Sequence, residues 1–482
     1  MSDLMQQFVR IGRLMPDKRD AERRLDDFGE IYGDYSTTGA AEQASRCEQC
    51  GIPYCQIHCP LQNNIPDWLK LTAEGRLEEA YAISQATNTF PEICGRICPQ
   101  DRLCEGSCVL EQSRHDTVTI GSIERFITDT AWERGWAQPP QPLQEIDRSV
   151  GIIGAGPAGL AAADRLRQYG YQVHVYDRHD RAGGLLIYGI PGFKLEKDIV
   201  IKRARLLEDG GARFHLGFEV GRDASLADLR QRHDAVLIAT GVYQSRDLQA
   251  PGVGLAGIHQ ALTYLTASNR KGLGDPVPAF SSGELDAKDK DVVVIGGGDT
   301  AMDCVRTAVR QGAKSVKCLY RRNRANMPGS QREVANAEEE GVEFVWLSAP
   351  EAFVGDGTVN AVRAHRIHLG VADFSGRQTP QPVPSSSFTL DADLVILALG
   401  FDPENLPQMF GEPELAISEW GTVRVLEPNK LTNVPGVFAA GDIMRGASLV
   451  VWAIRDGRDA ADGIHDYIQM RALGLAELAR AS

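Results

Sequence analysis

Eight of the ten cysteines of this 482-residue chain lie between positions 47 and 108, in two runs of four. This crowding constrains the fold more than any other feature, because thiols at such spacing are held together by disulfides, by zinc or by iron–sulfur clusters. The first run consists of Cys47, Cys50, Cys55 and Cys59, and the second run consists of Cys94, Cys98, Cys104 and Cys108.

Disulfides are the least expected of the three. The first residues carry charges throughout and lack the apolar segment of a secretory signal, which predicts a cytoplasmic protein whose thiols stay reduced. Structural zinc sites usually combine two closely spaced pairs of ligands that a longer loop separates. Each run here holds four thiols with no long loop between them. A proline directly after a cysteine, as at Pro60 and Pro99, is typical of bacterial ferredoxin runs, in which one cysteine serves the other cluster.

Eight thiolates suffice for two 4Fe–4S clusters, and this is our interpretation of the two runs. There are two alternatives. The runs could hold one cluster and leave some thiols spare, or they could form a zinc site. We expect His58, beside four cysteines, to be a bystander and not a ligand. We expect Cys304 and Cys318, which stand alone in apolar segments, to be buried small hydrophobic residues.

The segment between the runs, residues 65–88, has apolar side chains at helical spacing. Residues 1–145 are therefore predicted to form a helical domain wrapped around clusters. Prolines in residues 137–148 block regular structure and predict a linker. The formal charge of −14 disfavours a general affinity for nucleic acid or an anionic membrane, and no apolar run is long enough to cross a bilayer.

A dinucleotide-binding motif begins directly after this linker. An apolar strand leads into a glycine-rich turn, a helix and a second strand that ends at Asp177. Such glycines allow a tight turn, close approach of the backbone to a pyrophosphate and close packing of helix on strand, while the acid accepts hydrogen bonds from ribose hydroxyls. The predicted contacts in the turn are Gly154, Gly156, Pro157, Ala158 and Gly159.

The pattern recurs in residues 291–322, again between an apolar strand and a helix. Here the second strand ends in Arg321 and Arg322, with no acid at the ribose position. Arginine suits a 2′-phosphate, which a carboxylate would repel, so this site is predicted to prefer NADP over NAD. A pair of solvated surface arginines is the alternative. The other predicted contacts are Gly296, Gly298, Asp299 and Thr300.

Two different nucleotide sites indicate a flavin and a nicotinamide cofactor that exchange a hydride. Near the C-terminus, Gly441 and Asp442 follow a short strand and precede a helix expected to begin near Ala447. In flavoproteins with two dinucleotide folds, an aspartate here holds the flavin ribitol, and the positive end of the helix faces the pyrimidine side of the ring. A plain strand-to-helix turn is the alternative. The further predicted flavin contacts are Gly184, Leu185 and Gly241.

Similar apolar strands at residues 235–241 and 394–400 mark where the chain leaves the first nucleotide domain and returns to it. The predicted fold class is therefore α/β, with an N-terminal helical iron–sulfur domain followed by two Rossmann-like dinucleotide-binding domains, the NADP domain inserted in the FAD domain. The predicted domains are residues 1–145 (helical iron–sulfur), 146–250 (FAD-binding, first part), 251–389 (NADPH-binding) and 390–482 (FAD-binding, second part).

Taken in order, the cysteine runs and the motifs GAGPAG, GGLLIYGIP, GGGDTAMDC, YRR and AAGD make the chain resemble the small (beta) subunit of NADPH-dependent glutamate synthase over essentially its full length. The module is similar to the N-terminal part of dihydropyrimidine dehydrogenase and to NADH-dependent ferredoxin:NADP oxidoreductases. The resemblance implies FAD, NADPH and two 4Fe–4S clusters whose ligands cross between the runs. The implied ligands are Cys47, Cys50, Cys55 and Cys108 for one cluster, and Cys59, Cys98 and Cys104 with either Cys94 or Glu124 for the other.

The resemblance also implies a reaction and a partner. NADPH passes a hydride to FAD, and the clusters carry single electrons to an FMN-containing large (alpha) subunit that forms L-glutamate from 2-oxoglutarate and glutamine-derived ammonia. No catalytic acid, base or nucleophile is predicted in this chain. A self-contained NADPH oxidoreductase acting on ferredoxin or a small molecule, and a zinc-stabilised binding module, are the alternatives. The acidic run at residues 338–340 is expected to be a solvated helix end.

Overall fold

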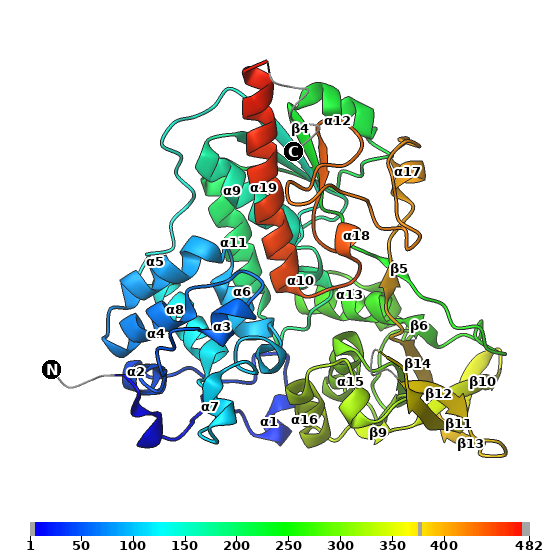
Figure 1. Cartoon of the computed structure of the whole chain (residues 1–482). Helices are drawn as coiled ribbons and strands as arrows, with labels where there is room; N and C mark the ends of the chain where they lie inside the picture. The colour runs from blue at the N-terminus through cyan, green and yellow to red at the C-terminus, as the bar shows by residue number, and fades with distance from the viewer. Residues whose placement is uncertain (1–4, 375–377, 475–482) are drawn as a thin grey trace.

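The computed structural model describes residues 5–374 and 378–474, which form three parts (Figure 1). Helices at the blue end of the colour scale form the N-terminal part, and two parallel sheets with flanking helices form the other two. This arrangement confirms the predicted α/β class with a helical region first. Within the described ranges, no helix is both long enough and apolar enough to cross a membrane.

The N-terminal part is helical, as expected. Residues 65–88 form two helices separated at Gly75, whose φ of +76° is easily adopted by a residue without a Cβ. Trp68 is completely buried in the core of this part. Residues 137–148 contain neither helix nor strand, as a linker should. The helices are α1 (Ala21–Arg24), α2 (Thr37–Ala44), α3 (Tyr54–Ile57), α4 (Ile65–Ala73), α5 (Leu77–Thr87), α6 (Pro91–Ile97), α7 (Val109–Gln112) and α8 (Ile120–Glu133), with 3-10 turns at Gln7–Val9 and Gln100–Arg102.

The first sheet has five parallel strands in the order β16-β4-β1-β2-β3. The chain runs from β1 to one side and later returns to the other, so β1 ends at the switch point where such sheets bind ligands. The strands are β1 (Ser149–Ile153), β2 (Gln172–Asp177), β3 (Arg213–Leu216), β4 (Ala235–Ile238) and β16 (Val437–Ala439). The flanking helices are α9 (Pro157–Tyr169), α10 (Leu185–Tyr188), α11 (Lys197–Asp209), α12 (Leu226–Arg232), α17 (Leu406–Met409), α18 (Asp442–Arg445) and α19 (Val450–Ala472).

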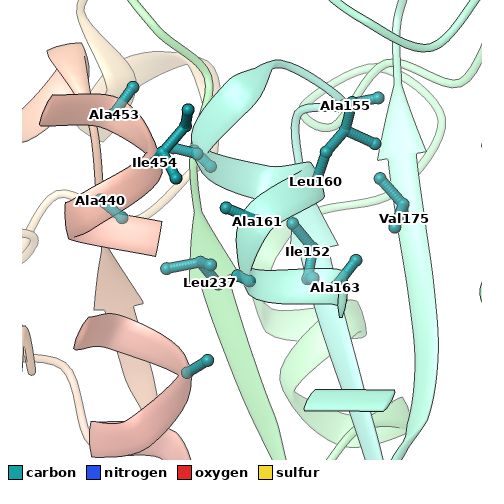
Figure 2. Close-up of a cluster of buried hydrophobic side chains, with 14 of the residues drawn as sticks. Ile152, Ala155, Leu160, Ala161, Ala163, Val175, Leu237, Ala440, Ala453 and Ile454 are labelled. Atoms are coloured by element: carbon teal, nitrogen blue, oxygen red, sulfur yellow. The ribbon is translucent and has the colours of Figure 1, made fainter. Parts of the chain in front are cut away.

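Small side chains let the helices of this unit pack closely on the sheet and on each other. Ile152 of β1, Ala161 of α9 and Ile454 of α19 belong to one buried cluster (Figure 2). Where α19 crosses α9, a Cβ on Gly457 would lie 2.1 Å from the Ala158 carbonyl oxygen, so the crossing requires glycine. Helix α19 begins three residues later than expected, because the short helix α18 precedes it.

The second sheet also has five parallel strands, in the order β6-β14-β7-β8-β9. Cys304 and Cys318 are fully buried in its core, as predicted. The strands are β6 (Ile258–Gln260), β7 (Asp291–Ile295), β8 (Ser315–Leu319), β9 (Glu343–Val345) and β14 (Leu394–Leu397). The helices are α13 (Ala261–Gly272), α14 (Pro278–Ser281), α15 (Asp299–Arg310) and α16 (Gln331–Glu339), with a 3-10 turn at Arg324–Asn326.

Strand β14 corrects the expected boundary at residue 389. It pairs with β6 and β7 in the second sheet, where both of its faces are buried, so by sheet membership the second unit continues through this strand. The chain crosses between the units at β5 (Gln244–Ser245) and β15 (Phe401–Asp402), which pair antiparallel. An antiparallel sheet inserted in the second unit consists of β10 (Ser348–Asp356), β11 (Thr358–Ala372), β12 (Gln378–Pro382) and β13 (Phe388–Asp391).

Candidate cofactor and electron-transfer site

A cavity of about 250 Å³ lies where the three parts of the chain meet. Its walls come from the carboxyl ends of β1, β4 and β16, from the first turn of α15 and from the residues around Cys98. Ten predicted cofactor contacts line it, namely Gly154, Gly156, Pro157, Ala158, Asp177, Leu185, Gly241, Asp299, Thr300 and Asp442. The other predicted contacts, which do not line it, are Gly159, Gly184, Gly296, Gly298, Arg321, Arg322 and Gly441.

The first glycine turn has the geometry that close approach of a phosphate requires. Gly154 has a φ of +109°, and a Cβ there would lie 2.3 Å from the Ala239 carbonyl oxygen. A Cβ on Gly159 would lie 2.0 Å from the Gly154 carbonyl oxygen, so this glycine lets α9 pack against the turn. A Cβ on Gly156 would meet no atom within 4 Å, because this residue faces the cavity at the N-terminus of α9. The turn therefore leaves room for a pyrophosphate at a helix N-terminus.

Asp177 is held at the end of β2 by two backbone donors. Its Oδ2 accepts the N–H of Ala155 at 2.7 Å and its Oδ1 accepts the N–H of His179 at 2.8 Å. A carboxylate has about four lone-pair sites, so capacity remains for ribose hydroxyls. A second pocket continues from Asp177 past the side chains of Phe218 and Phe410, which suits the adenine end of a dinucleotide.

The C-terminal segment closes the other end of the cavity. Gly441 has a φ of +78°, and a Cβ there would lie 2.9 Å from the Ala158 Cβ. Burial raises the pKa of Asp442 to about 6, and the backbone N–H of Ser448 opposes that effect. Val450, the first residue of α19, lines the cavity, so the positive end of this helix dipole faces the cavity.

The remaining predicted flavin contacts lie beside the same turn. Gly184 has a φ of +53°, and a Cβ there would lie 2.9 Å from the Gly156 Cα. Gly241 follows β4 with a φ of +72°. Thr240 is a residue that sequence reasoning missed, and its buried hydroxyl has no hydrogen-bond partner within the described residues. A polar group of a bound flavin would satisfy it.

The second glycine turn meets the same cavity from the opposite side. Gly296 has a φ of +155°, and Gly298 has open space where a Cβ would lie. Asp299 and Thr300 begin α15 and line the cavity, and the Asp299 carboxylate accepts the N–H of Ser330 at 2.9 Å. This turn also fits a phosphate at a helix N-terminus.

Arg321 and Arg322 follow β8, and neither lines the cavity. Arg321 is exposed. Arg322 is half-buried, and its Nε donates to the carbonyl oxygen of Gln378 at 3.4 Å. Their role in reading a 2′-phosphate stays a prediction.

The fold brings one cysteine of the second run to three of the first. Burial raises the pKa of the Cys47, Cys50 and Cys55 thiols, and the charge of Cys108 adds to the effect on all three. Cys50, Cys55 and Cys108 are partly exposed. This first group of thiols is therefore the more solvent-accessible of the two.

The second group of thiols consists of Cys59, Cys94, Cys98 and Cys104, and the charge of Glu124 raises the pKa of each of them. The Cys94 and Cys98 thiols contact each other, and the charge of Cys59 reaches both Cys98 and Cys104.

Glu124 is buried beside these thiols. Burial raises its pKa to about 8, and its Oε1 accepts the Asn88 Nδ2–H at 3.1 Å. Within the described ranges, no three His, Cys, Asp or Glu side chains converge on the position of a single metal ion. His58 is exposed, and its Nδ1 lies 2.9 Å from the Tyr54 carbonyl oxygen.

Charged residues at the cavity form the part of the site that the sequence analysis missed. Lys194 Nζ lies 2.9 Å from Asp303 Oδ1 and 4.0 Å from Glu333 Oε2. Arg332 donates to the Gln100 side chain at 2.7 Å, which links the second unit to the cysteine-bearing part. All four of these charged residues line the cavity. No local pattern marks Lys194, because its partners come from distant segments.

The acidic run at residues 338–340 is not wholly solvated, contrary to expectation. Glu338 is exposed and pairs with Arg324 at 2.8 Å. The side chain of Glu340 is completely buried between Arg306 and Arg310. The expectation is wrong for Glu340 because its partners lie on α15, which the sequence alone does not place beside it.

Known proteins similar to this chain identify its family. The small chain of glutamate synthase (NADPH) of Azospirillum brasilense is 67% identical over 465 residues, which cover 96% of each chain. The corresponding small chain of Escherichia coli strain K12 is 45% identical over 479 residues, 98% of this chain and 100% of that one. This chain belongs to the glutamate synthase small-chain family.

Two family models match this chain, one over its helical part and one over its two nucleotide units together. Residues 24–136 match the model described as dihydropyrimidine dehydrogenase domain II, 4Fe–4S cluster. Residues 148–457 match the pyridine nucleotide-disulphide oxidoreductase model. The predicted family and oxidoreductase class are confirmed, and the helical part is a 4Fe–4S cluster domain joined to a flavin and nicotinamide nucleotide unit.

One further relative and one solved structure are similar to this chain. A putative oxidoreductase of Escherichia coli, AegA, is 43% identical over 480 residues, 98% of this chain and 72% of that one. The structure of Mycobacterium tuberculosis FprA in complex with NADPH has a TM-score of 0.58 and 20% sequence identity, and the match covers 70% of this chain and 87% of that one. The latter shows a shared fold.

Proposed function

We propose that this chain oxidises NADPH and delivers single electrons to an FMN-containing large subunit that forms L-glutamate from 2-oxoglutarate and glutamine-derived ammonia. The observation that carries the proposal is the shared cavity, which is lined by the first glycine turn, by the first residues of α15 after the second glycine turn, and by Cys98. FAD bound there would accept a hydride and release electrons singly, and two 4Fe–4S clusters would carry them onward. Hydride transfer followed by single-electron transfer needs no catalytic acid or base from the chain.

The residues of the first unit bind and orient the dinucleotide. Gly154 and Gly156 bring the backbone to the pyrophosphate, Asp177 accepts ribose hydroxyls, and Asp442 holds the ribitol. The N-terminus of α19 stabilises negative charge on the pyrimidine side of the ring. In the second unit, Gly298 and Thr300 place NADPH at the opposite wall, with the 2′-phosphate read by Arg321 and Arg322.

The two groups of thiols have different places in the proposed path. Cys98 lines the cavity, so the second group (Cys59, Cys94, Cys98 and Cys104) would hold the cluster that first receives electrons. The first group (Cys47, Cys50, Cys55 and Cys108) is partly exposed, which suits an exit toward a partner protein. Buried Glu124, within reach of the second group, is the alternative to Cys94 as fourth ligand.

A self-contained NADPH oxidoreductase is the second candidate. Its support is the 43% identity of nearly the whole chain to the putative oxidoreductase AegA, in which the matched region is part of a longer protein. Co-purification decides between the two candidates. The proposed function predicts that a tagged chain retains a large flavoprotein subunit and that the complex forms glutamate with NADPH. Isolation without such a subunit, combined with NADPH-dependent reduction of ferredoxin, would favour the second candidate.

Separable loss of the two clusters tests the proposed electron path. Cys50→Ser should chiefly remove the cluster of the first group, and Cys59→Ser that of the second, while both variants keep FAD because residues 148–457 form the nucleotide unit. Low-temperature EPR of the reduced variants, with iron, acid-labile sulfide and flavin counts, measures this. If both variants lost the same signals, one cluster would be the better account of the eight cysteines.

A further inference from the structure

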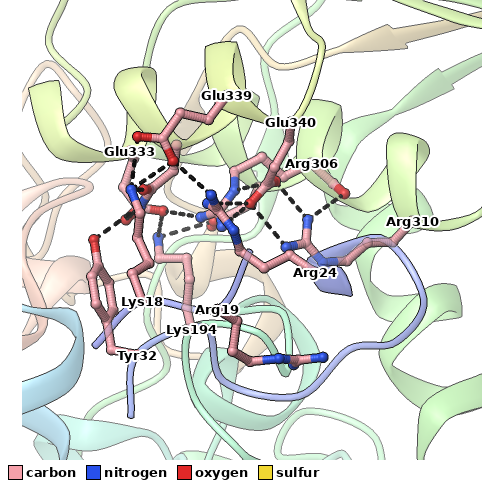
Figure 3. A network of polar contacts seen from close by, with 12 residues as sticks. Lys18, Arg19, Arg24, Tyr32, Lys194, Arg306, Arg310, Glu333, Glu339 and Glu340 are labelled. Carbon is pink, nitrogen blue, oxygen red and sulfur yellow. Dashed lines mark hydrogen bonds and ion pairs between the residues drawn. The ribbon is translucent and has the colours of Figure 1, made fainter. Parts of the chain in front are cut away.

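A network of ion pairs joins the three parts of the chain beside the cavity (Figure 3). Its centre is Glu340, at the end of α16. The Glu340 carboxylate accepts hydrogen bonds from Arg306 at 2.8 Å and from Arg310 at 2.7 and 3.0 Å. The side chains of all three residues are completely buried. Buried charges of this kind keep a fixed arrangement, because separating them leaves an unpaired charge without water.

A segment of the helical part, residues 17–33, reaches into this network, and we name it the strap. Arg24, on α1, is only 3% exposed and contacts Glu339 at 2.6 Å and Glu340 at 3.3 Å. Lys18 contacts Glu339 at 2.6 Å. The strap has a closed base, because the N–H of Gly33 donates to the Asp17 carbonyl oxygen at 2.7 Å. Its charged residues therefore meet the second unit from a stiff loop.

The first nucleotide unit enters the same network through two adjacent residues. The ring of Phe193 lies 4.4 Å from the guanidinium carbon of Arg306 and 4.0 Å from that of Arg310. Lys194 pairs with Asp303, on the same helix as those arginines, and lines the cavity. Glu333 pairs with Arg306 at 2.5 Å and lies 4.0 Å from Lys194, so the ion pairs form a continuous path from Arg24 to the cavity wall.

We propose that the strap fixes the second nucleotide unit in the orientation that hydride transfer requires, with Arg24 as its central positioning residue. This inference rests on the proposed function. The chain crosses between the two units at β5 and β15, which pair over two residues each, and so short a ladder resists rotation weakly. The strap holds the second unit at a different place, at the end of α16 beside α1 (Figure 1).

The physical reason is the steep dependence of hydride transfer on geometry. The reacting atoms must come within about 3–3.5 Å, and a displacement of about 1 Å can cost a hundredfold in rate. Asp299 and Thr300 begin α15, and Arg306 and Arg310 lie on the same helix. A shift of α15 relative to the first unit would therefore move the bound nicotinamide away from the flavin.

The test compares two adjacent arginines of α1 in the holoprotein. Arg24→Gln removes a charge from the network, while Arg23→Gln makes the same change at an exposed position. We expect Arg24→Gln to slow flavin reduction at saturating NADPH by about tenfold or more, with little change in the NADPH concentration for half-maximal rate. Arg24→Lys should recover much of the rate. Flavin and iron contents should match the wild type, and so should reduction by dithionite.

A second measurement needs no turnover. Amide hydrogen exchange of α16 and β15, without NADPH, should be faster in Arg24→Gln than in Arg23→Gln. An unchanged flavin reduction rate in Arg24→Gln, or equal slowing by Arg23→Gln, would overturn the proposal. If Arg24→Gln fails to fold, Lys18→Gln at the half-buried end of the network carries the same expectation with a smaller effect. Wild-type protein whose flavin NADPH does not reduce would refute the proposed function, while the exchange data would still test the strap.

Discussion

The two nucleotide units are built alike, yet their glycine turns are not equivalent. Both have five parallel strands, with the turn after β1 or β7, and both turns direct a helix N-terminus at one cavity. The third position of the motif is Gly159 in the first unit and Ala301 in the second. Strand β2 ends in the acidic Asp177, whereas Arg321 and Arg322 occupy the corresponding place after β8.

These differences show which part of a shared motif is general and which is specific. In both turns the second glycine has open space where a Cβ would lie, which is what approach of a phosphate needs. The third position depends on local packing. A methyl group on Gly159 would lie 2.0 Å from the Gly154 carbonyl oxygen, whereas the second unit buries the methyl group of Ala301 completely. The residue after the second strand sets the charge offered to the ribose.

The largest effect expected is loss of one nucleotide from one unit. Gly156→Val should give protein without FAD that still binds NADPH, because the side chain would occupy the space of the pyrophosphate. Gly298→Val should do the reverse. Flavin content and NADPH titration measure both variants. Stoichiometric FAD in Gly156→Val would show that the two sites are assigned the wrong way round.

A smaller effect distinguishes the third positions of the two turns. Gly159→Ala should lower the free energy of unfolding by about 3 kcal/mol, at the upper end for overpacking, because the clash is with backbone. The matched change Ala301→Gly should cost about 1–2 kcal/mol, from lower helix propensity and the loss of one buried methyl group. Chemical denaturation followed by flavin fluorescence and circular dichroism compares them. Equal costs would mean that the two turns pack alike.

The arginines after β8 should set the preference of the second unit for NADPH over NADH. Arg322→Glu should raise the KM for NADPH by about 10- to 100-fold, since a charged hydrogen bond contributes about 1.5–3 kcal/mol. The KM for NADH should change little, because NADH lacks the 2′-phosphate. Steady-state kinetics with both nucleotides provide the comparison. Equal changes for the two nucleotides would contradict 2′-phosphate recognition by this residue.

The smallest expected effect is a difference in acid stability. His174 of β2, His215 of β3 and His233 lie together on the first sheet, with His174 Nδ1 3.0 Å from His215 Nε2. Burial lowers the pKa of all three, to about 4 for His233. The unfolded chain then binds more protons, so stability is complete above the usual value of 6.5 and falls as the pH drops toward 4.

Thermal melts between pH 6.5 and about pH 4 test the contribution of the histidine cluster to stability. His233→Gln should flatten the loss of Tm with falling pH, whereas His58→Gln, at an exposed position of the helical part, should leave the slope unchanged. A wild-type slope in His233→Gln would show that other groups control acid unfolding of the first unit.

Local chemistry explains why much of the site was predictable. The turns at Gly154 and Gly296 need a backbone conformation that glycine adopts readily, so they are visible in any window that contains them. The helices of residues 65–88 follow from apolar periodicity, and the burial of Cys304 follows from its apolar neighbours. The predicted place of β14 differed from the structure because an apolar strand of four residues carries no information about which sheet it joins.

The sequence by itself determined the cysteine runs, the two nucleotide turns and the family, because each depends on residues that are neighbours in the chain. Only the tertiary structure decided that Glu340 is buried, and that Arg24, Arg306 and Lys194 form one path to the cavity. Such contacts join segments far apart in sequence, and side-chain charge is paired only where folding brings those segments together. Hydrophobic periodicity and motif spacing indicate the local structure that a segment favours. The burial and ion pairing of its side chains depend on which other segments pack against it.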